Sequence, residues 1–464
     1  MWLLNTTDYE LRSFPSIEAA PDYAALSHRW DPIGEVTFAD IRDFKRARRR
    51  VGWSKIENAC SVAKALLPGY AWIWIDTCCI DKSSSAELSE AINSMFMWYL
   101  HCGVCLAYLN DVPAGDDPRS PRSAFRSSQW FTRGWTLQEL LAPARTMLFF
   151  SQDWTIIDTR DALVQVIQDI TAIGCEVLRD TSDDFPRQFN HLLHDTHPDS
   201  GGGALDFPTV RFIKSLREYQ CRFLPSFWAT RLRSHSVAKR MSWAAGRTTT
   251  RPEDTAYSLM GIFGISMPII YGEGSEMAFR RLQLEIIRQS TDQTIFGWGA
   301  CIDPSVLVTK MDGQATDWSA HPKAVGLLAS SPMLFIFSGN LQSTTLRSLT
   351  NAVSLMGGVH VSHYYETHRG IHIRLPLRPL FKLPSNPETS QDPTAQLFLG
   401  ALECIDNDDG RHIGLVLMRC SDEDAGWYQC VNVDFTGMRH NAYGRVGFLD
   451  GQPGWELSTI YIKL

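Results

Sequence analysis

Several familiar features are missing from this 464-residue sequence. It has no Gly-rich phosphate-binding fingerprint, which argues against a dehydrogenase or a P-loop nucleotidase. It has no strong excess of one charge, and a net charge of −7 argues against nucleic-acid binding as its main role. The opening MWLLNTTDYE carries neither a basic stretch nor a long apolar core. We therefore expect a cytoplasmic protein whose Asn5 sequon is unused.

Long apolar runs are also scarce. The longest uncharged stretch, 255–272, is interrupted by Gly261, Gly264 and Pro268. This pattern favours a buried helix followed by a loop, and no membrane span is expected.

The cysteines do not form a metal-binding pattern. There are 11, an odd number, and Cys102-Gly-Val-Cys105 has no second Cys pair at zinc-ribbon spacing. The adjacent Cys78 and Cys79 come after an apolar run, and a strand end would point them to opposite faces. We expect buried thiols and no metal site.

The length and the changing periodicity predict three regions. Residues 1–160 alternate short apolar runs with amphipathic segments, which is typical of a doubly wound α/β domain with a parallel sheet. Residues 161–292 read as a helical support region, with a loop at 197–204, and 293–464 as a β-rich domain. In the first region we expect strands at 23–27, 72–75, 104–109 and 146–150, and helices at 54–67, 86–100 and 132–141.

Later segments give weaker signals. Thr250-Arg-Pro-Glu253 has the form of a capping box, and Ser275 opens an amphipathic helix. Strand-like runs, spaced as in an antiparallel sheet, are expected at 333–337, 371–375, 396–399, 413–418 and 446–449. The basic run at 45–50 is interpreted as a solvated helix face or loop in preference to a localisation signal or a phosphate patch.

Three clusters carry a family resemblance. They are ALSHRW at 25–30, WIDTCCID at 74–81 and RGWTLQEL at 133–140. In order and spacing they resemble the fungal heterokaryon-incompatibility (HET) domain over residues 23–155, and 242–274 resembles the segment after that domain in many members. Lys82 departs from the pattern, because many members carry glutamine there.

A more distant resemblance concerns mechanism. Leu26-Ser27-His28-Arg29 and Trp135-Thr-Leu-Gln-Glu139-Leu are similar to motifs of plant-type TIR domains, and 87–92 looks like the TIR helix before the third strand. The resemblance implies a TIR-like (flavodoxin-like) fold for the N-terminal domain. It also implies NAD+ as substrate and Glu139 as the catalytic residue.

The chemistry of NAD+ cleavage suits such a site. Nicotinamide leaves as a neutral molecule, so the main need is a carboxylate that stabilises the oxocarbenium-like ribose. In a doubly wound sheet, ligands bind at the carboxyl ends of the strands. With Glu139 as catalytic residue, we expect the substrate-binding residues to be Ser27, His28, Arg29, Trp30, Asp76 and Trp135.

Several of these residues could have a structural role in place of a functional one. Trp135 and its apolar neighbours could form a core stripe, with Glu139 paired nearby. Asp76 and Asp81 could hold a turn through backbone hydrogen bonds, and His28 could be a packing histidine.

The sequence leaves two classes of function. One is an effector in non-self recognition and regulated cell death that hydrolyses NAD+. The other is a non-enzymatic module that self-associates or binds a partner through the TIR-like domain. A protein partner for the C-terminal region is also expected, whereas a metabolic enzyme on a similar sheet has no motif in its favour.

Overall fold

The structure is a computed structural model. It describes residues 1–31, 34–66, 70–179, 232–299, 301–302, 323–353, 364–368, 370–382, 396–408, 410–420, 426–432, 445–447 and 454–464. The chain divides into two compact units, each described by itself. The first unit comprises residues 1–234 and 247–269, and the second comprises 235–246 and 270–464.

A mixed sheet forms the centre of the first unit. Its order is β2-β1-β4-β3-β5-β6-β7. The four strands β4, β3, β5 and β6 are mutually parallel, and the strands at both edges pair antiparallel. The bounds are β1 Trp2–Asn5, β2 Leu11–Ser13, β3 Ala24–His28, β4 Trp72–Ile75, β5 Val104–Tyr108, β6 Thr146–Phe150 and β7 Ile156–Thr159.

The four parallel strands confirm the sequence prediction to within one residue. β1, β2 and β7 were not predicted, because each has only three or four residues and β2 is largely exposed. If the four parallel strands are numbered 1 to 4 along the chain, their order across the sheet is 2-1-3-4, which is the order of the first four strands of flavodoxin-like sheets.

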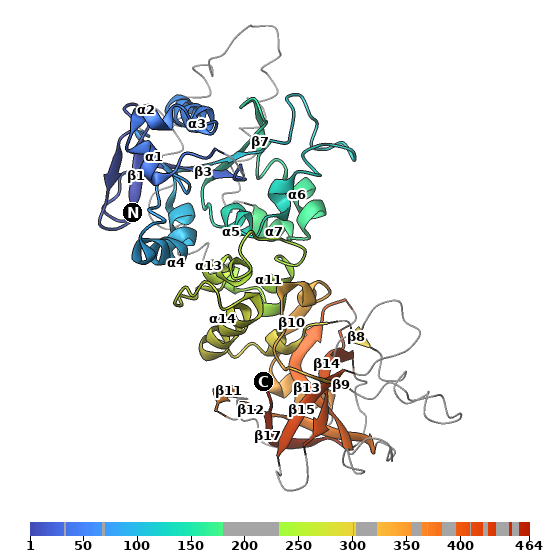
Figure 1. Cartoon of the computed structure of the whole chain (residues 1–464). Helices are drawn as coiled ribbons and strands as arrows, with labels where there is room; N and C mark the ends of the chain where they lie inside the picture. The colour runs from blue at the N-terminus through green and yellow to red at the C-terminus, as the bar shows by residue number, and fades with distance from the viewer. Residues whose placement is uncertain are drawn as a thin grey trace. The chain divides into compact units, whose positions relative to one another are not determined.

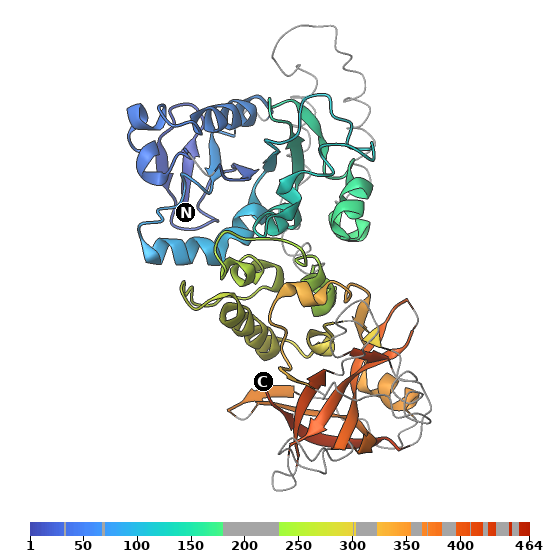
Figure 2. The same ribbon diagram turned by 45° about the vertical axis from the view of Figure 1, so that its right-hand side comes forward.

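Helices cover both faces of these parallel strands. α3 (Trp53–Leu66) lies on one face, and α4 (Ser85–His101) with α5 (Thr136–Leu141) lies on the other (Figures 1 and 2). Both long helices bury a stripe at helical spacing, and Ser84 caps α4 by accepting a hydrogen bond from the backbone N–H of Glu87. A doubly wound α/β domain is therefore present, as predicted.

The predicted helix at 132–141 is wrong in its first half. A 3₁₀ turn, η1 (Gln129–Thr132), ends at Arg133, whose backbone is extended, and α5 begins only at Thr136. The Thr136 hydroxyl donates to the carbonyls of Trp130 and Arg133, at 2.5 and 2.9 Å, and fixes this break. Among the described residues of the first unit, the remaining short helices are α1 Phe38–Ile41, α2 Phe44–Ala47, α6 Val164–Thr171, α7 Cys175–Leu178, α12 Asp254–Tyr257 and α13 Met260–Phe263.

Two expectations for residues 161–292 meet different outcomes. The predicted capping box at 250–253 is wrong. The residue before α12 is Glu253, whose side chain makes no capping hydrogen bond. The Thr250 hydroxyl instead accepts a hydrogen bond from the Arg133 guanidinium at 3.2 Å. The stretch 255–272 is a pair of buried helical turns followed by a loop, as predicted. The loop predicted at 197–204 lies outside the described residues.

The second unit holds a closed barrel. Strands β13, β12, β17, β15 and β14 pair in that order, and β13 also pairs with β14 (Figure 1). Inward-facing residues alternate along β12, where Ile371, Ile373, Leu375 and Leu377 are buried. The barrel and its neighbouring strands are β8 Cys301–Ile302, β9 Lys323–Val325, β10 Leu341–Ser343, β11 Tyr364–Thr367, β12 Gly370–Lys382, β13 Gln396–Asp406, β14 His412–Arg419, β15 Trp427–Asn432, β16 Arg445–Gly447 and β17 Glu456–Ile462.

Four of the five strands predicted for this β-rich region are present at least in part, as β12, β13, β14 and β16. The strand expected at 333–337 is wrong, because Pro332 opens a 3₁₀ turn, η3 (Pro332–Phe335), in which only Pro332 and Phe335 are buried. Most pairs are antiparallel, but β15–β17 and β16–β8 are parallel. The unit also contains α11 Val237–Ser242, α14 Ser275–Gln289, η2 Gln293–Phe296 and α16 Leu346–Ala352.

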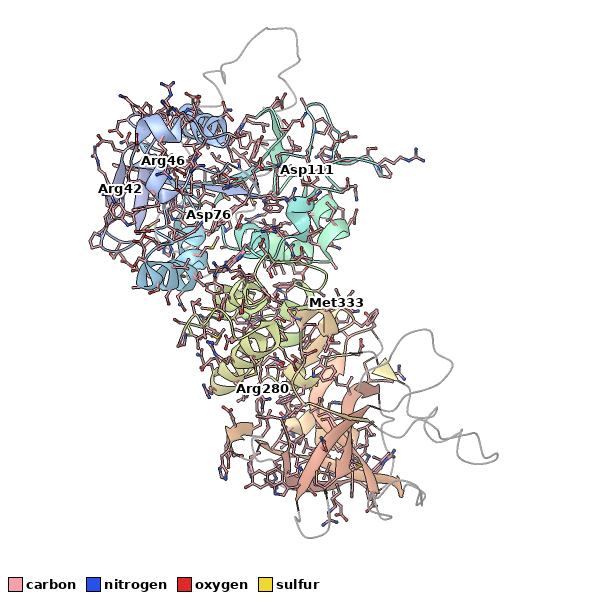
Figure 3. The ribbon with its side chains drawn as sticks, viewed as in Figure 1. Arg42, Arg46, Asp76, Asp111, Arg280 and Met333 are labelled. Atoms are coloured by element: carbon pink, nitrogen blue, oxygen red, sulfur yellow. The ribbon has the colours of Figure 1, made fainter. Side chains whose placement is uncertain are left out.

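The basic run lies on and after α2. Lys45, Arg48 and Arg49 are exposed, as expected for a solvated face. Arg46 and Arg50, by contrast, form ion pairs with the buried Asp40 at 2.5 and 3.0 Å (Figure 3 labels Arg46). Part of the run therefore neutralises a buried carboxylate.

Most described cysteines are buried thiols, as predicted. These are Cys60, Cys78, Cys79, Cys102, Cys105, Cys404 and Cys430. Over the described ranges there is no group of three or more His, Cys, Asp or Glu side chains that could hold a metal ion. A search of the same ranges finds no helix with the length and apolarity to cross a membrane.

Candidate functional site

Glu139 and Ser27 meet at the carboxyl end of β3. The Ser27 hydroxyl donates to Glu139 Oε2 at 2.5 Å, and the Trp130 indole N–H donates to Ser27 Oγ at 2.9 Å. All three side chains are buried, and Glu139 is 3% exposed. Since Ser27 lies near the end of a fully buried strand and Glu139 lies on a fully buried helical turn, both positions are fixed by the core.

The pKa of Glu139 is strongly perturbed. Burial and, to a lesser degree, the nearby Asp76 carboxylate raise it to about 8, against the opposing effects of Ser27, Arg133 and Arg247. A carboxyl with a pKa near neutrality can exchange its proton during a reaction. Such groups concentrate at functional sites, although buried structural carboxyls show the same shift.

A second cluster lies beside it, where β3 and β4 end. The Trp30 indole N–H donates to Asp76 Oδ2 at 2.7 Å, and His28 Nδ1 lies 3.8 Å from Asp76 Oδ1 (Figure 3 labels Asp76). On its other side, His28 Nε2 lies 3.8 Å from Glu35 Oε1, which also binds the Lys55 ammonium at 2.5 Å. Two carboxylates thus flank a buried imidazole.

The polar atoms of this cluster are incompletely satisfied. Within the part of the chain that the structure describes, Asp76 Oδ1 and both ring nitrogens of His28 have no hydrogen-bond partner. Burial raises the pKa of Asp76, and burial with nearby Lys55 and Lys82 lowers the pKa of His28 well below its usual value. Burying a polar atom without a hydrogen-bond partner costs free energy, so a hydroxyl-bearing ligand or a water that hydrogen-bonds to these atoms would be stabilised here.

Lys82 covers the exposed indole of this cluster. Its ammonium lies 3.5 Å from the centroid of the Trp30 ring, and burial lowers its pKa although Asp76 opposes the shift. Trp30 itself is 42% exposed. Lys82, the residue that departs from the HET-like motif, therefore lies at the edge of the candidate site.

Two predicted site residues do not join these contacts. Trp135 donates its indole N–H to Asp254 Oδ2 at 3.0 Å, which ties α5 to the segment after residue 247. Arg29 is half-buried and, among the described residues, forms no hydrogen bond or ion pair. The structure thus brings Ser27 together with Glu139, and Trp30 and His28 with Asp76.

Sequence reasoning missed several residues of this region. Trp130, Glu35 and Lys55 lie outside the three motifs. Trp130 contacts Ser27 across 103 positions of the sequence, whereas Glu35 lies close to His28 in the sequence and binds Lys55. Arg247 was also missed. It donates to the Arg133 carbonyl at 2.9 Å, and its charge acts on Glu139.

Comparison with family models supports the resemblance carried by the motifs at 25–30 and 74–81, whereas the motif at 133–140 lies outside the matched range. Residues 23–118 match the family model described as heterokaryon incompatibility protein (HET). Residues 277–443, in the second unit, match a domain of unknown function, DUF8212. The first unit therefore contains a segment similar to the HET domain.

A curated relative points the same way. The chain is 40% identical over 272 residues to the vegetative incompatibility protein HET-E-1 of Podospora anserina. The similarity covers 57% of this chain and 16% of the relative, so the chain spans only a small part of that protein's length. No solved structure matches the chain.

Proposed function

We propose that this protein acts in heterokaryon, or vegetative, incompatibility, in the cytoplasm, as a non-self recognition and cell-death effector. The HET match at residues 23–118 and the similarity to a vegetative incompatibility protein support this role. The proposal assigns the effector role to the first unit and a partner-binding role to the β-rich second unit.

The effector chemistry that we propose is hydrolysis of NAD+ by a TIR-like domain. The observation that carries this proposal is the buried Glu139 carboxyl, held by Ser27 at a strand end and raised in pKa to about 8. The flavodoxin-like order of the parallel strands is consistent with it.

In this reaction the bond between ribose C1′ and the nicotinamide nitrogen breaks, and its electron pair leaves with nicotinamide. Ionised Glu139 stabilises the positive charge that develops on the ribose. Water then forms the new C1′–O bond and releases its proton, which yields ADP-ribose. Glu139 must be deprotonated to act, so a pKa near 8 limits the reaction at neutral pH.

The neighbouring cluster supplies binding groups in this proposal. Asp76 Oδ1 would accept hydrogen bonds from ribose hydroxyls, since it is buried without a partner among the described residues. The half-exposed Trp30 would stack on a ring, and Arg29 would meet the pyrophosphate.

A specific observation favours a second candidate, a non-enzymatic assembly module. Glu139 is 3% exposed, and its carboxyl is already hydrogen-bonded by Ser27. In this second candidate the Glu139 carboxyl, buried and already hydrogen-bonded within the protein, stabilises the fold and does not contact a ligand. In that case the surface of the domain, through self-association, would carry the signal.

The test is NAD+ loss and nicotinamide release by the purified full chain, at dilute and at high concentration. Wild type is compared with Glu139→Gln, which retains an acceptor for Ser27, and with Glu57→Gln, a control at an exposed position on α3. Turnover in wild type and the control, but not in Glu139→Gln, supports the hydrolase. If wild type has no turnover at either concentration, the assembly module is favoured.

A further inference from the structure

The second unit contains a preformed cavity of about 390 Å³. This volume is at the lower end of small-molecule sites and has room for roughly a dozen non-hydrogen atoms. Arg280, labelled in Figure 3, contributes to its wall from α14. The lining also includes Glu276, Trp298, Leu328, Ser330 and Leu334.

The wall of the cavity is held in place by buried hydrogen bonds. The side-chain amide of the fully buried Gln283 accepts from the backbone N–H of Ala329 at 3.0 Å and donates to its carbonyl at 2.8 Å. The Trp298 indole N–H donates to the Leu327 carbonyl at 2.9 Å. Because these bonds fix the loop and the indole, the cavity needs little ordering before a ligand binds.

Glu276 and Arg280 bring opposite charges to the cavity wall. They are four positions apart on α14, a spacing at which opposite charges commonly pair. Nevertheless, neither side chain forms an ion pair or a hydrogen bond with any described residue, whereas the side chains of Arg281 and Arg288 of the same helix bind Glu273 and Glu285. Two opposite charges therefore line the same cavity without neutralising each other.

We propose that this cavity binds a small zwitterion with an apolar body, of the class of aromatic or large aliphatic α-amino acids. The guanidinium of Arg280 binds the carboxylate, and Glu276 binds the ammonium group. Trp298, Leu328 and Leu334 contact the apolar side chain. This site is independent of the Glu139 site, so the two proposals fail or succeed separately.

Calorimetric titration of the full chain tests the proposal with three compounds that share a phenyl ring. L-Phenylalanine carries both charges, 3-phenylpropanoate only the carboxylate, and 2-phenylethylamine only the ammonium group. Arg280→Gln and Glu276→Gln remove one cavity charge each. Arg347→Gln is the matched control, because Arg347 on α16 is exposed and its side chain has no partner among the described residues.

We expect wild type and Arg347→Gln to bind phenylalanine at least tenfold more tightly than either singly charged compound. Arg280→Gln should weaken phenylalanine and 3-phenylpropanoate but not 2-phenylethylamine, and Glu276→Gln should show the opposite selectivity. Tighter binding of 3-phenylpropanoate than of phenylalanine would overturn the zwitterion proposal. Absence of binding by all three compounds, or equal binding by wild type and both cavity variants, would overturn it too.

Discussion

Ser27 Oγ and Glu139 Oε2 are 2.5 Å apart, although 112 positions separate the two residues in the sequence. Trp130 donates to the same serine oxygen, so the serine proton is directed to the carboxylate. This contact favours the ionised form of Glu139, while burial favours the neutral form. The balance between the two effects leads to the first three predictions.

The first prediction concerns the pH dependence of NAD+ hydrolysis. The active form of Glu139 is the carboxylate, and its pKa in the free protein is about 8. We therefore expect kcat/KM to rise as the pH increases from about 6, to reach half its maximum near pH 8 and to level off about one pH unit higher. Initial rates of nicotinamide release between about pH 6 and 9.5 check the prediction, and a profile that falls with pH would contradict it.

The second prediction concerns Ser27→Ala. Removing the hydroxyl takes away a hydrogen bond that lowers the pKa of Glu139, so the rise in kcat/KM should move to higher pH. Measuring the profile of this variant beside wild type gives the shift directly. A change in the plateau without a change in the midpoint would mean that Ser27 does not control the charge of Glu139.

The third prediction concerns stability and holds with or without catalysis. The folded protein raises the pKa of Glu139 from 4.5 to about 8, so it binds a proton that the unfolded chain releases. The resulting stabilisation is fully present below pH 4.5 and is lost as the pH rises through 8, at up to about 1.4 kcal/mol per pH unit. Glu139→Gln should lack this loss.

Urea unfolding of both proteins between about pH 5 and 8.5 measures the effect. The difference in the free energy of unfolding, variant minus wild type, should increase with pH. Glu57→Gln, at an exposed position, provides the control. A constant difference across this range would show that Glu139 is not perturbed in the folded protein.

The fourth prediction concerns the basic run. Burial raises the pKa of Asp40, but hydrogen bonds from Arg50 and Thr37 outweigh that effect and lower it. Asp40→Asn should destabilise the first unit by about 1–3 kcal/mol, because two guanidinium groups lose their charged partner. Arg50→Gln should have a smaller effect in the same direction.

Arg49→Gln is the control for this prediction, because Arg49 belongs to the same run, is exposed, and its side chain has no partner among the described residues. Its free energy of unfolding should stay within about 0.5 kcal/mol of wild type. Equal losses for Arg49→Gln and Arg50→Gln would refute the structural role of the Asp40 pairs.

The fifth prediction concerns Gly261 in α13. A Cβ at this position would lie 2.1 Å from Cβ of Phe96 in α4, and neither atom can move without its backbone. Gly261→Ala should therefore destabilise the protein by about 1–3 kcal/mol, despite the better helix propensity of alanine. Gly326→Ala is the matched control, since its added Cβ would only touch the Leu328 carbonyl at 3.6 Å. Thermal unfolding of the two variants decides the point.

Local sequence patterns predicted much of the first unit. β4 and β5 are continuous apolar runs, β3 and β6 are apolar over most of their length, and α3 and α4 carry apolar stripes at helical spacing. These signals need no knowledge of distant residues. The same logic failed at 333–337, where an apolar run became a 3₁₀ turn after Pro332. Short apolar runs are ambiguous, because burial and chain geometry decide their conformation.

The candidate site was only partly predictable. Position at a strand end pointed to Ser27 and Asp76, because the carboxyl ends of parallel strands meet at one edge of a sheet. The resemblance to TIR domains pointed to Glu139. They could not show that Trp135 pairs with Asp254, or that Trp130 holds Ser27. Both facts depend on the path of loops that have no periodicity.

By itself, the sequence determined the doubly wound strands and helices, the β-rich character of the second unit and the HET-like motifs, because these depend on the order and spacing of neighbouring residues. Only the tertiary structure decided the raised pKa of Glu139, the Asp40 ion pairs and the closure of the barrel between β13 and β14. The physical reason is that burial, electrostatic fields and sheet closure depend on distances through space.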